Sequence, residues 1–378
     1  MTYLDNAATT FPKPLRVIKA MERCMRTYCG NPGRSSHRLA LAAAEAVFDT
    51  RSEIAGLFGI SKPENVIFAQ NATHALNKVL RGMIAPRSHV IISSLEHNSV
   101  YRPVRAICDS VGAYFDIVDA SKSDEELLAD IKSKMDHRTK LVVTLHASNI
   151  CSRVLPIGRI GAICRQNGAD YVVDASQSAG IYDIDAERDM ISVICAPGHK
   201  GLFGPQGTGF AAFCDGFDFS RLLPSEFGGN GMNSSEPGMG SIPPESYEAG
   251  TVNVPGIVGL GEGVRYVRSV GTENILRHER ELFAAARDGL SSLGAQILLP
   301  EHEGGVLLFN IAGRSGSEIS SALADMGICT RAGLHCAPLA HEALGTGGDG
   351  VRVSFSAFST AEDVARLCAA TEKIISES

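Results

Sequence analysis

A chain of 378 residues is long enough for two or three domains, and 44% hydrophobic and 20% charged residues are ordinary for a globular protein with a large core. The formal net charge of −7, without any basic run, argues against nucleic acid as the main partner. No apolar run approaches membrane-spanning length, and the first residues do not resemble a signal peptide. We therefore expect a cytoplasmic protein that does not contact a membrane.

The ten cysteines are scattered, without a C-x-x-C pair or a Cys/His cluster at zinc spacing, so no metal site is predicted. In a cytoplasmic protein most cysteines are reduced, buried thiols. This is the expectation for those within apolar runs: Cys108, Cys164, Cys195, Cys214 and Cys368. Cys336, in the stretch TRAGLHCAP, could be a nucleophile, a metal ligand or a small buried residue, and the stretch alone does not decide between them.

The middle of the chain alternates helical patterns with apolar, β-branched runs. In chain order we predict a helix over 73–84, a strand over 90–95, a helix over 123–135, a strand over 141–148, a helix over 157–168, and strands over 171–176 and 190–196. Apolar strands that alternate with helices are typical of a mostly parallel sheet covered by helices on both faces.

After about residue 256 the pattern changes to that of a separate, smaller α+β domain. The predicted elements are helices over 256–270 and 272–294, a strand over 304–313, a helix over 316–327, strands over 328–333 and 350–358, and a helix over 360–377. Residues 228–246, rich in Gly, Pro, Ser and Met, are predicted to form a long surface loop.

Polar residues follow the predicted strands. Glu-His-Asn at 96–98, His-Ala-Ser-Asn at 146–149, Asp174 with Gln177, and His199 with Lys200 each come after one strand. Because the chemistry of α/β proteins lies at the carboxyl ends of the strands, we expect these groups to share one cleft.

Lys200 stands in a glycine-rich turn, either as an ordinary surface lysine or as an amine held in a cleft to form a Schiff base. Pyridoxal phosphate needs such a lysine, a carboxylate for its ring nitrogen and an anion site for its phosphate. Asp174 can supply the carboxylate, and residues 71–73, at the start of a helix, can supply the anion site. His97 could stack on the ring or be structural, and Gln177 could donate to the phenolic oxygen.

The motifs YLDNAATT, NPGRSSHR, QNATHALN, LEHNS, HASN, VDASQSAG, GHKGLFGPQGTG and YEAGT occur in that order, and RAGLHCAP follows. Together they resemble the class-V aminotransferase superfamily of pyridoxal-phosphate enzymes, and within it the second group of cysteine desulfurases, which includes selenocysteine lyase-like members. The resemblance implies a fold-type I α/β protein and a homodimer. It implies a large domain over 14–255, with a mostly parallel seven-stranded sheet, and a small domain over 1–13 and 256–378 that carries the cysteine loop.

The resemblance also implies a role for each matching residue. Lys200 would form the Schiff base, Asp174 would pair with the ring nitrogen, and His97 would stack on the ring. The remaining cofactor residues would be Ala72, Thr73 and His199 at the phosphate, Gln177 at the phenolic oxygen, Asn149 near ring and substrate, and Thr251 at the phosphate of the neighbouring subunit. Arg352 would bind the substrate carboxylate as a guanidinium clamp, and the other substrate residues would be Asn149, Arg331 and His37.

By the same resemblance, Cys336 is the nucleophile that takes sulfur from L-cysteine, leaving L-alanine and a persulfide that an acceptor protein or a small thiol removes. Only a thiolate is competent, so His335, Arg331 or substrate groups must help supply it. His335 could be a base or a packing residue, and both readings stay open.

Two positions depart from the family pattern. Pro197 stands where the family has a serine hydroxyl on the phosphate, which predicts weaker cofactor retention. Leu334 stands where many members have histidine, which leaves the preference between L-cysteine and L-selenocysteine open. The alternatives are a selenocysteine lyase, another β-lyase, a transaminase, and a non-catalytic sulfur-relay or scaffold protein.

Overall fold

The computed structural model describes residues 1–33, 36–229, 237–302 and 304–377. Its centre is a seven-stranded sheet in which only β8 runs antiparallel to its neighbours. The strands in spatial order are β2 (Val66–Ala69), β8 (Gly209–Phe213), β7 (Val193–Pro197), β6 (Asp170–Asp174), β5 (Thr139–Leu145), β3 (His89–Ser93) and β4 (Tyr114–Val118). The predicted seven-stranded, mostly parallel sheet is confirmed, although β2, β4 and β8 had not been predicted individually.

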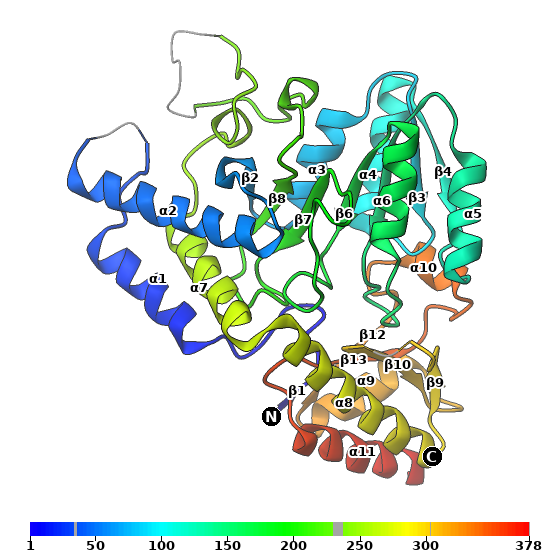
Figure 1. The fold of residues 1–378 in the computed structure, drawn as a ribbon. Helices are drawn as coiled ribbons and strands as arrows, with labels where there is room; N and C mark the ends of the chain where they lie inside the picture. The colour runs from blue at the N-terminus through cyan, green and yellow to red at the C-terminus, as the bar shows by residue number, and fades with distance from the viewer. Residues whose placement is uncertain (34–35, 230–236, 303, 378) are drawn as a thin grey trace.

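Helices cover both faces of this sheet because its strands are apolar on both sides (Figure 1). On β3, Val90 and Ile92 face one side and Ile91 the other, as the two-residue period of a strand requires. The first face is covered by α3 (Ala72–Met83) and α4 (Asn98–Val111). The second is covered by α2 (Arg38–Leu57), α5 (Asp124–Lys134), α6 (Ile157–Asn167) and α7 (Val254–Val270).

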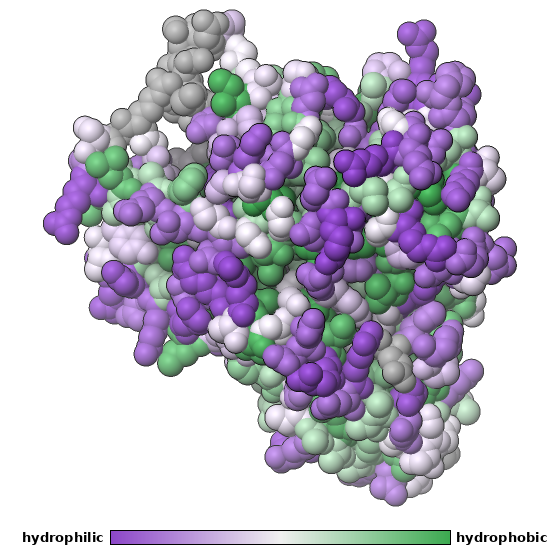
Figure 2. All heavy atoms as spheres, in the orientation of Figure 1, coloured by the Kyte–Doolittle hydropathy of each residue, from purple (hydrophilic) through white to green (hydrophobic). Residues whose placement is uncertain are grey.

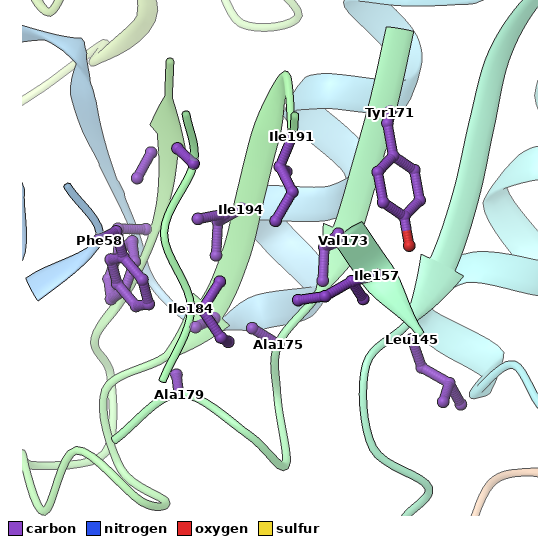
Figure 3. Packing of buried hydrophobic residues seen from close by; sticks show 14 of the residues in the cluster. Phe58, Leu145, Ile157, Tyr171, Val173, Ala175, Ala179, Ile184, Ile191 and Ile194 are labelled. Carbon is purple, nitrogen blue, oxygen red and sulfur yellow. The ribbon is translucent and has the colours of Figure 1, made fainter. Parts of the chain in front are cut away.

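Figure 3 shows part of the second face, where Tyr171 and Val173 of β6 lie close to Ile157 of α6. The Tyr171 hydroxyl is fully buried and lies 2.7 Å from the Thr144 hydroxyl, so its polar atom is satisfied within the core.

The C-terminal part is built on a four-stranded antiparallel sheet of order β12-β13-β10-β9. Its strands are β9 (Gln296–Leu298), β10 (Val306–Asn310), β12 (Arg331–Ala332) and β13 (Val351–Ser354). Its helices are α8 (Thr272–Ser292), α9 (Gly316–Asp325), α10 (Pro338–Ala343) and α11 (Ala361–Ser376). On the face in Figure 2, hydrophilic residues predominate and hydrophobic ones are scattered between them.

The single strand predicted over 328–333 is wrong. It consists of two short strands in different sheets, because β11 (Ile328–Cys329) pairs with β1 (Thr2–Tyr3) and β12 pairs with β13. The N-terminus therefore lies within the C-terminal part of the molecule. Part of the predicted loop over 228–246, residues 230–236, lies outside the described residues. The part of the chain that the structure describes also contains three short 3₁₀ helices: Pro63–Asn65, Phe219–Arg221 and Glu245–Tyr247.

The two long helices after residue 253 pack on different parts of the molecule. Helix α7 packs on α1 (Leu15–Thr27) and α2, whereas α8 packs on α11. The domain boundary at residue 255 stays a prediction. Among the described residues, no helix is both long and apolar enough to cross a membrane.

All ten cysteines are free thiols. Cys108, Cys164 and Cys195 are buried as expected, but Cys214 and Cys368 are only half-buried. Cys214 follows the last residue of β8, and Cys368 lies on α11. The apolar run around each of them does not imply full burial at these positions.

The turn that carries Lys200 is held by a close crossing with α7. An ideal Cβ on Gly263 would lie 2.1 Å from the Leu202 carbonyl oxygen, so no larger residue fits without moving the turn.

We predict that Gly263→Ala lowers the free energy of unfolding by about 1–3 kcal/mol through overpacking. Urea unfolding measures this, with Gly216→Ala as control because no atom lies within 4 Å of a Cβ there. Equal stability of the two variants would contradict the tight crossing.

Candidate active site

One cavity of about 230 Å³ lies at the carboxyl ends of β5, β6 and β7. Eight of the residues predicted from the sequence line it together: Ala72, Thr73, His97, Asn149, Asp174, Gln177, His199 and Lys200. Parallel strands bring their carboxyl ends to one edge of the sheet, which explains why residues so far apart in sequence meet there.

Lys200 follows β7, and burial lowers the pKa of its amine to about 8. A larger fraction of this amine is therefore neutral near pH 7 than of an ordinary lysine, as a nucleophilic or basic lysine requires. The backbone of the turn is fixed by the Thr10 hydroxyl, which donates to the Lys200 carbonyl at 3.0 Å. The Lys13 ammonium donates to the neighbouring His199 carbonyl at 2.7 Å.

Asp174, the last residue of β6, is 3% exposed. Its Oδ1 accepts hydrogen bonds from the backbone and the hydroxyl of Ser176, and Oδ2 has no such partner among the described residues. Gln177 donates one amide hydrogen to the Ala7 carbonyl at 3.0 Å and keeps a second. These two residues offer an acceptor and a donor to the same cavity.

His97 occupies the N-cap of α4, where its Nδ1 accepts from the Ser99 backbone N–H at 3.0 Å. Burial lowers the pKa of this imidazole, which favours the neutral ring. The cap fixes the ring at the cavity wall. His97 thus has a structural role as a cap, and the predicted ring stacking stays a prediction.

The start of α3 has free backbone donors that an anion could use. Asn71 caps the helix by accepting from the His74 N–H at 2.8 Å, which leaves the backbone N–H groups at Ala72 and Thr73 in the first helical turn. His199 Nδ1 is buried without a hydrogen-bond partner among the described residues, and burial lowers the pKa of that ring to about 4. Helical N–H groups and an unpartnered imidazole nitrogen in one cavity fit a phosphate group.

Arg352 is 3% exposed and does not line this cavity. Its guanidinium pairs with Asp5 at 3.0 Å and donates to the Asn149 carbonyl at 3.0 Å, while its Nε has no partner among the described residues. Arg331, with an exposed side chain, pairs with the same carboxylate at 2.8 Å. Asp5 was missed from the sequence: it lies in the motif YLDNAATT, but the sequence carries no signal that this carboxylate faces two arginines.

The Cys336 loop is tied to the cavity rim by its backbone. The Asn149 side-chain amide donates to the His335 carbonyl at 2.9 Å, and the Asn98 N–H donates to the Cys336 carbonyl at 2.9 Å. His335 is buried, whereas Cys336 is exposed. Asn149 lies in the segment that follows β5, and Asn98 is the first residue of α4, directly after the cap His97.

Two further predicted residues, His37 and Thr251, also lie outside the cavity. His37 is exposed and caps α2, where its Nδ1 accepts from the Ala40 N–H at 3.2 Å. Thr251 is also exposed and borders a different hollow, next to Phe48 and Glu248. The predicted reach of Thr251 into a neighbouring subunit is not tested by a single chain, and both roles stay predictions.

Glu96 was expected to share the cleft with the other polar groups, but it lies in the interior and does not line the cavity. It is fully buried, its Oε1 accepts from Ser93 and from the Leu145 N–H, and its Oε2 has no partner among the described residues. Burial, and to a lesser degree the Asp174 carboxylate, raise the pKa of this carboxyl to about 8. Glu96 is therefore neutral near pH 7 and adds no second negative charge beside Asp174.

Comparison with known proteins matches the aminotransferase class-V family to residues 2–367. A probable cysteine desulfurase of Methanothermobacter thermautotrophicus is 33% identical, over 98% of this chain and 94% of the relative. One of Halalkalibacterium halodurans is 30% identical, over 99% and 93%. The apo structure of a cysteine desulfurase from Thermococcus onnurineus NA1 superposes with a TM-score of 0.91 at 29% identity, covering 100% of this chain and 95% of that one. The resemblance and the fold class predicted from the motifs are confirmed.

The buried Glu96 carboxyl predicts a pH-dependent stability. Its pKa is about 8 in the folded chain and 4.5 as the ordinary value, so its stabilisation is complete below about pH 4.5 and is lost as the pH rises through about 8. Because Glu96→Gln carries no such proton, we expect its free energy of unfolding to rise relative to wild type between about pH 5 and 8. The rise should be on the order of 1 kcal/mol or more. Glu372→Gln, on the exposed face of α11, is the control. Urea unfolding measures both variants against wild type. If the free energy of unfolding of Glu96→Gln relative to wild type did not change with pH, the raised pKa of Glu96 would be contradicted.

Proposed function

The chain belongs to the class-V aminotransferase family, and we propose that it is a pyridoxal-phosphate-dependent cysteine desulfurase that converts L-cysteine to L-alanine and keeps the sulfur as a persulfide on Cys336. One observation carries the proposal. The buried amine of Lys200, the Asp174 carboxylate and the anion site of α3 line one cavity, and the Cys336 loop is hydrogen-bonded to its rim.

The residues of the cavity fit pyridoxal phosphate. Lys200 would hold its aldehyde carbon, Asp174 its ring nitrogen, and the start of α3 with His199 its phosphate. Gln177 has one amide hydrogen left for the phenolic oxygen. When bound, the cofactor supplies an electron sink for negative charge at the substrate Cα. Pro197 lines the same cavity without a hydroxyl, so the phosphate depends on the remaining donors.

The residues of the chain divide the reaction between them. Arg352 binds the substrate carboxylate, and the Lys200 amine moves the proton at the substrate Cα. The Cys336 thiolate then attacks the substrate sulfur: an S–S bond forms, the Cβ–S bond breaks, and its electron pair stays on the carbon fragment, which is protonated to alanine. L-cysteine and one thiol thus give L-alanine and one persulfide, with no other reactant.

Transfer of the sulfur needs an acceptor, and the exposed Cys336 is placed to reach one, either a protein or a small thiol. We also propose a homodimer. Helices α1 and α2 lie at one edge of the molecule (Figure 1). They carry exposed large apolar side chains, among them Leu15, Ile18, Met25, Leu41 and Phe48. In a dimer Thr251 would reach the phosphate of the second copy. The cytoplasmic location stays a prediction.

The first prediction from the proposed function concerns the sulfur nucleophile. Wild-type protein with L-cysteine and a reductant should release equal amounts of alanine and sulfide, and Cys336→Ser should release neither, because it cannot form the persulfide. Alanine is measured by chromatography and the persulfide by mass spectrometry. Cys29→Ser, a change of another exposed thiol, is the control and should keep wild-type activity.

The same assay with L-selenocysteine separates the alternatives. Turnover of L-selenocysteine alone, retained in Cys336→Ser, would identify a selenocysteine lyase and overturn the desulfurase. Amino-group transfer to a keto acid would identify a transaminase. If the cofactor is bound but neither L-cysteine nor L-selenocysteine is turned over, the remaining alternative is a non-catalytic scaffold protein.

The second prediction concerns the carboxylate clamp. Arg352→Lys should raise KM for L-cysteine by about 10- to 100-fold, since one lost hydrogen bond between charged groups is worth about 1.5–3 kcal/mol. The effect on kcat should be smaller. Steady-state kinetics measure both, and Arg366→Lys, in an exposed ion pair on α11, is the control. An unchanged KM in a folded Arg352→Lys protein would remove Arg352 from the substrate site.

A further inference from the structure

Three polar side chains, those of His335, His341 and Thr346, form a hydrogen-bonded row next to Cys336. His335 Nε2 lies 3.1 Å from the Arg331 carbonyl oxygen, and His335 Nδ1 lies 3.3 Å from His341 Nε2. His341 Nδ1 lies 2.6 Å from the Thr346 hydroxyl. The two imidazoles are stacked with ring centroids 5.5 Å apart, and both are buried, at 8% and 3% exposure.

The Arg331 carbonyl oxygen, at one end of this row, fixes which atom donates in every hydrogen bond of the row. A carbonyl oxygen only accepts, so His335 Nε2 must carry the hydrogen, and in a neutral ring Nδ1 is then an acceptor. His341 must therefore donate through Nε2, which leaves its Nδ1 to accept from the Thr346 hydroxyl. Burial lowers the pKa of His335 to about 4 and also lowers the pKa of His341, so both rings are neutral near pH 7.

Both nitrogens of His335 are thereby occupied. The Nε2 hydrogen is bound by the Arg331 carbonyl, and the Nδ1 lone pair is bound by His341. A base needs a free lone pair within reach of the proton it removes. His335 offers none to the Cys336 thiol.

The loop itself needs support, because two successive non-glycine residues are left-handed. His335 has φ +49° and Cys336 has φ +57°. This conformation is unfavourable for residues that carry a Cβ and persists only where the surroundings enforce it. The carbonyl of His335 accepts from Asn149, that of Cys336 accepts from Asn98, and the His335 side chain is hydrogen-bonded to His341.

We propose that His335 is a positioning residue rather than the base for Cys336, and that Thr346, His341 and His335 form a hydrogen-bonded chain that fixes the left-handed turn presenting the thiol. The proposal rests on the proposed function, since this thiol is the one that takes sulfur. It decides between the two roles that the sequence left open for His335.

The test separates positioning from base catalysis in the protein loaded with its cofactor. Thr346→Val removes the far hydroxyl and keeps the shape, Thr346→Ser restores the hydroxyl, and His335→Gln keeps one donor and one acceptor. For each we would measure kcat and KM with L-cysteine, and the pH profile of Cys336 alkylation by iodoacetamide, followed by peptide mass spectrometry.

Thr346→Val should lower kcat by about tenfold or more with little change in KM, because small misplacements of a reacting atom are costly. Thr346→Ser should keep the wild-type kcat. The pH midpoint of alkylation should be the same in wild type, Thr346→Val and His335→Gln. A midpoint displaced by a unit or more in His335→Gln alone, or full kcat in Thr346→Val, would overturn the proposal.

One further measurement does not depend on turnover. In wild-type protein labelled with ¹⁵N-histidine, NMR at pH 7 should show His335 and His341 both neutral, with the hydrogen on Nε2. A hydrogen on Nδ1 of His335, or a charged His335, would overturn the chain even if L-cysteine is turned over. Absence of alanine together with the expected tautomers would reject the desulfurase but retain the chain.

Discussion

The Asp5 carboxylate is the contact on which the C-terminal half of the site depends. Arg331 and Arg352 are direct partners across the β12–β13 pair, and like charges in that position destabilise a sheet. Asp5 lies between them and pairs with both. Because the Cys336 loop leaves β12 just after Arg331, and β13 with Arg352 follows the loop, the position of the thiol depends on a carboxylate more than 300 residues away in the chain.

The same contact explains how the N-terminus belongs to the site. Strand β1 adds to β11, and the next residues carry Asp5 to the arginines and Thr10 to the carbonyl of Lys200. One short segment therefore touches the turn of the large sheet and the sheet that carries the cysteine loop.

The sequence could predict what is local. The strand–polar–helix pattern identified Lys200, Asp174 and the start of α3, and the ordered motifs identified the family. It could not predict Asp5 as the partner of two arginines, or His341 as the partner of His335, because both contacts depend on how distant or tightly turned segments fold together. The strand over 328–333 failed for the same reason: its two halves take partners from opposite ends of the chain.

An exposed thiol on a loop fastened to the cavity has a consequence for where the sulfur goes. Cys336 is accessible from outside while its carbonyl and that of His335 are held at the rim. A persulfide on Cys336 would be exposed to solvent as soon as it forms. Its destination would then be settled by competition: the thiol that arrives soonest and reacts fastest takes it, and a dedicated acceptor prevails only by docking ahead of the small thiols around it.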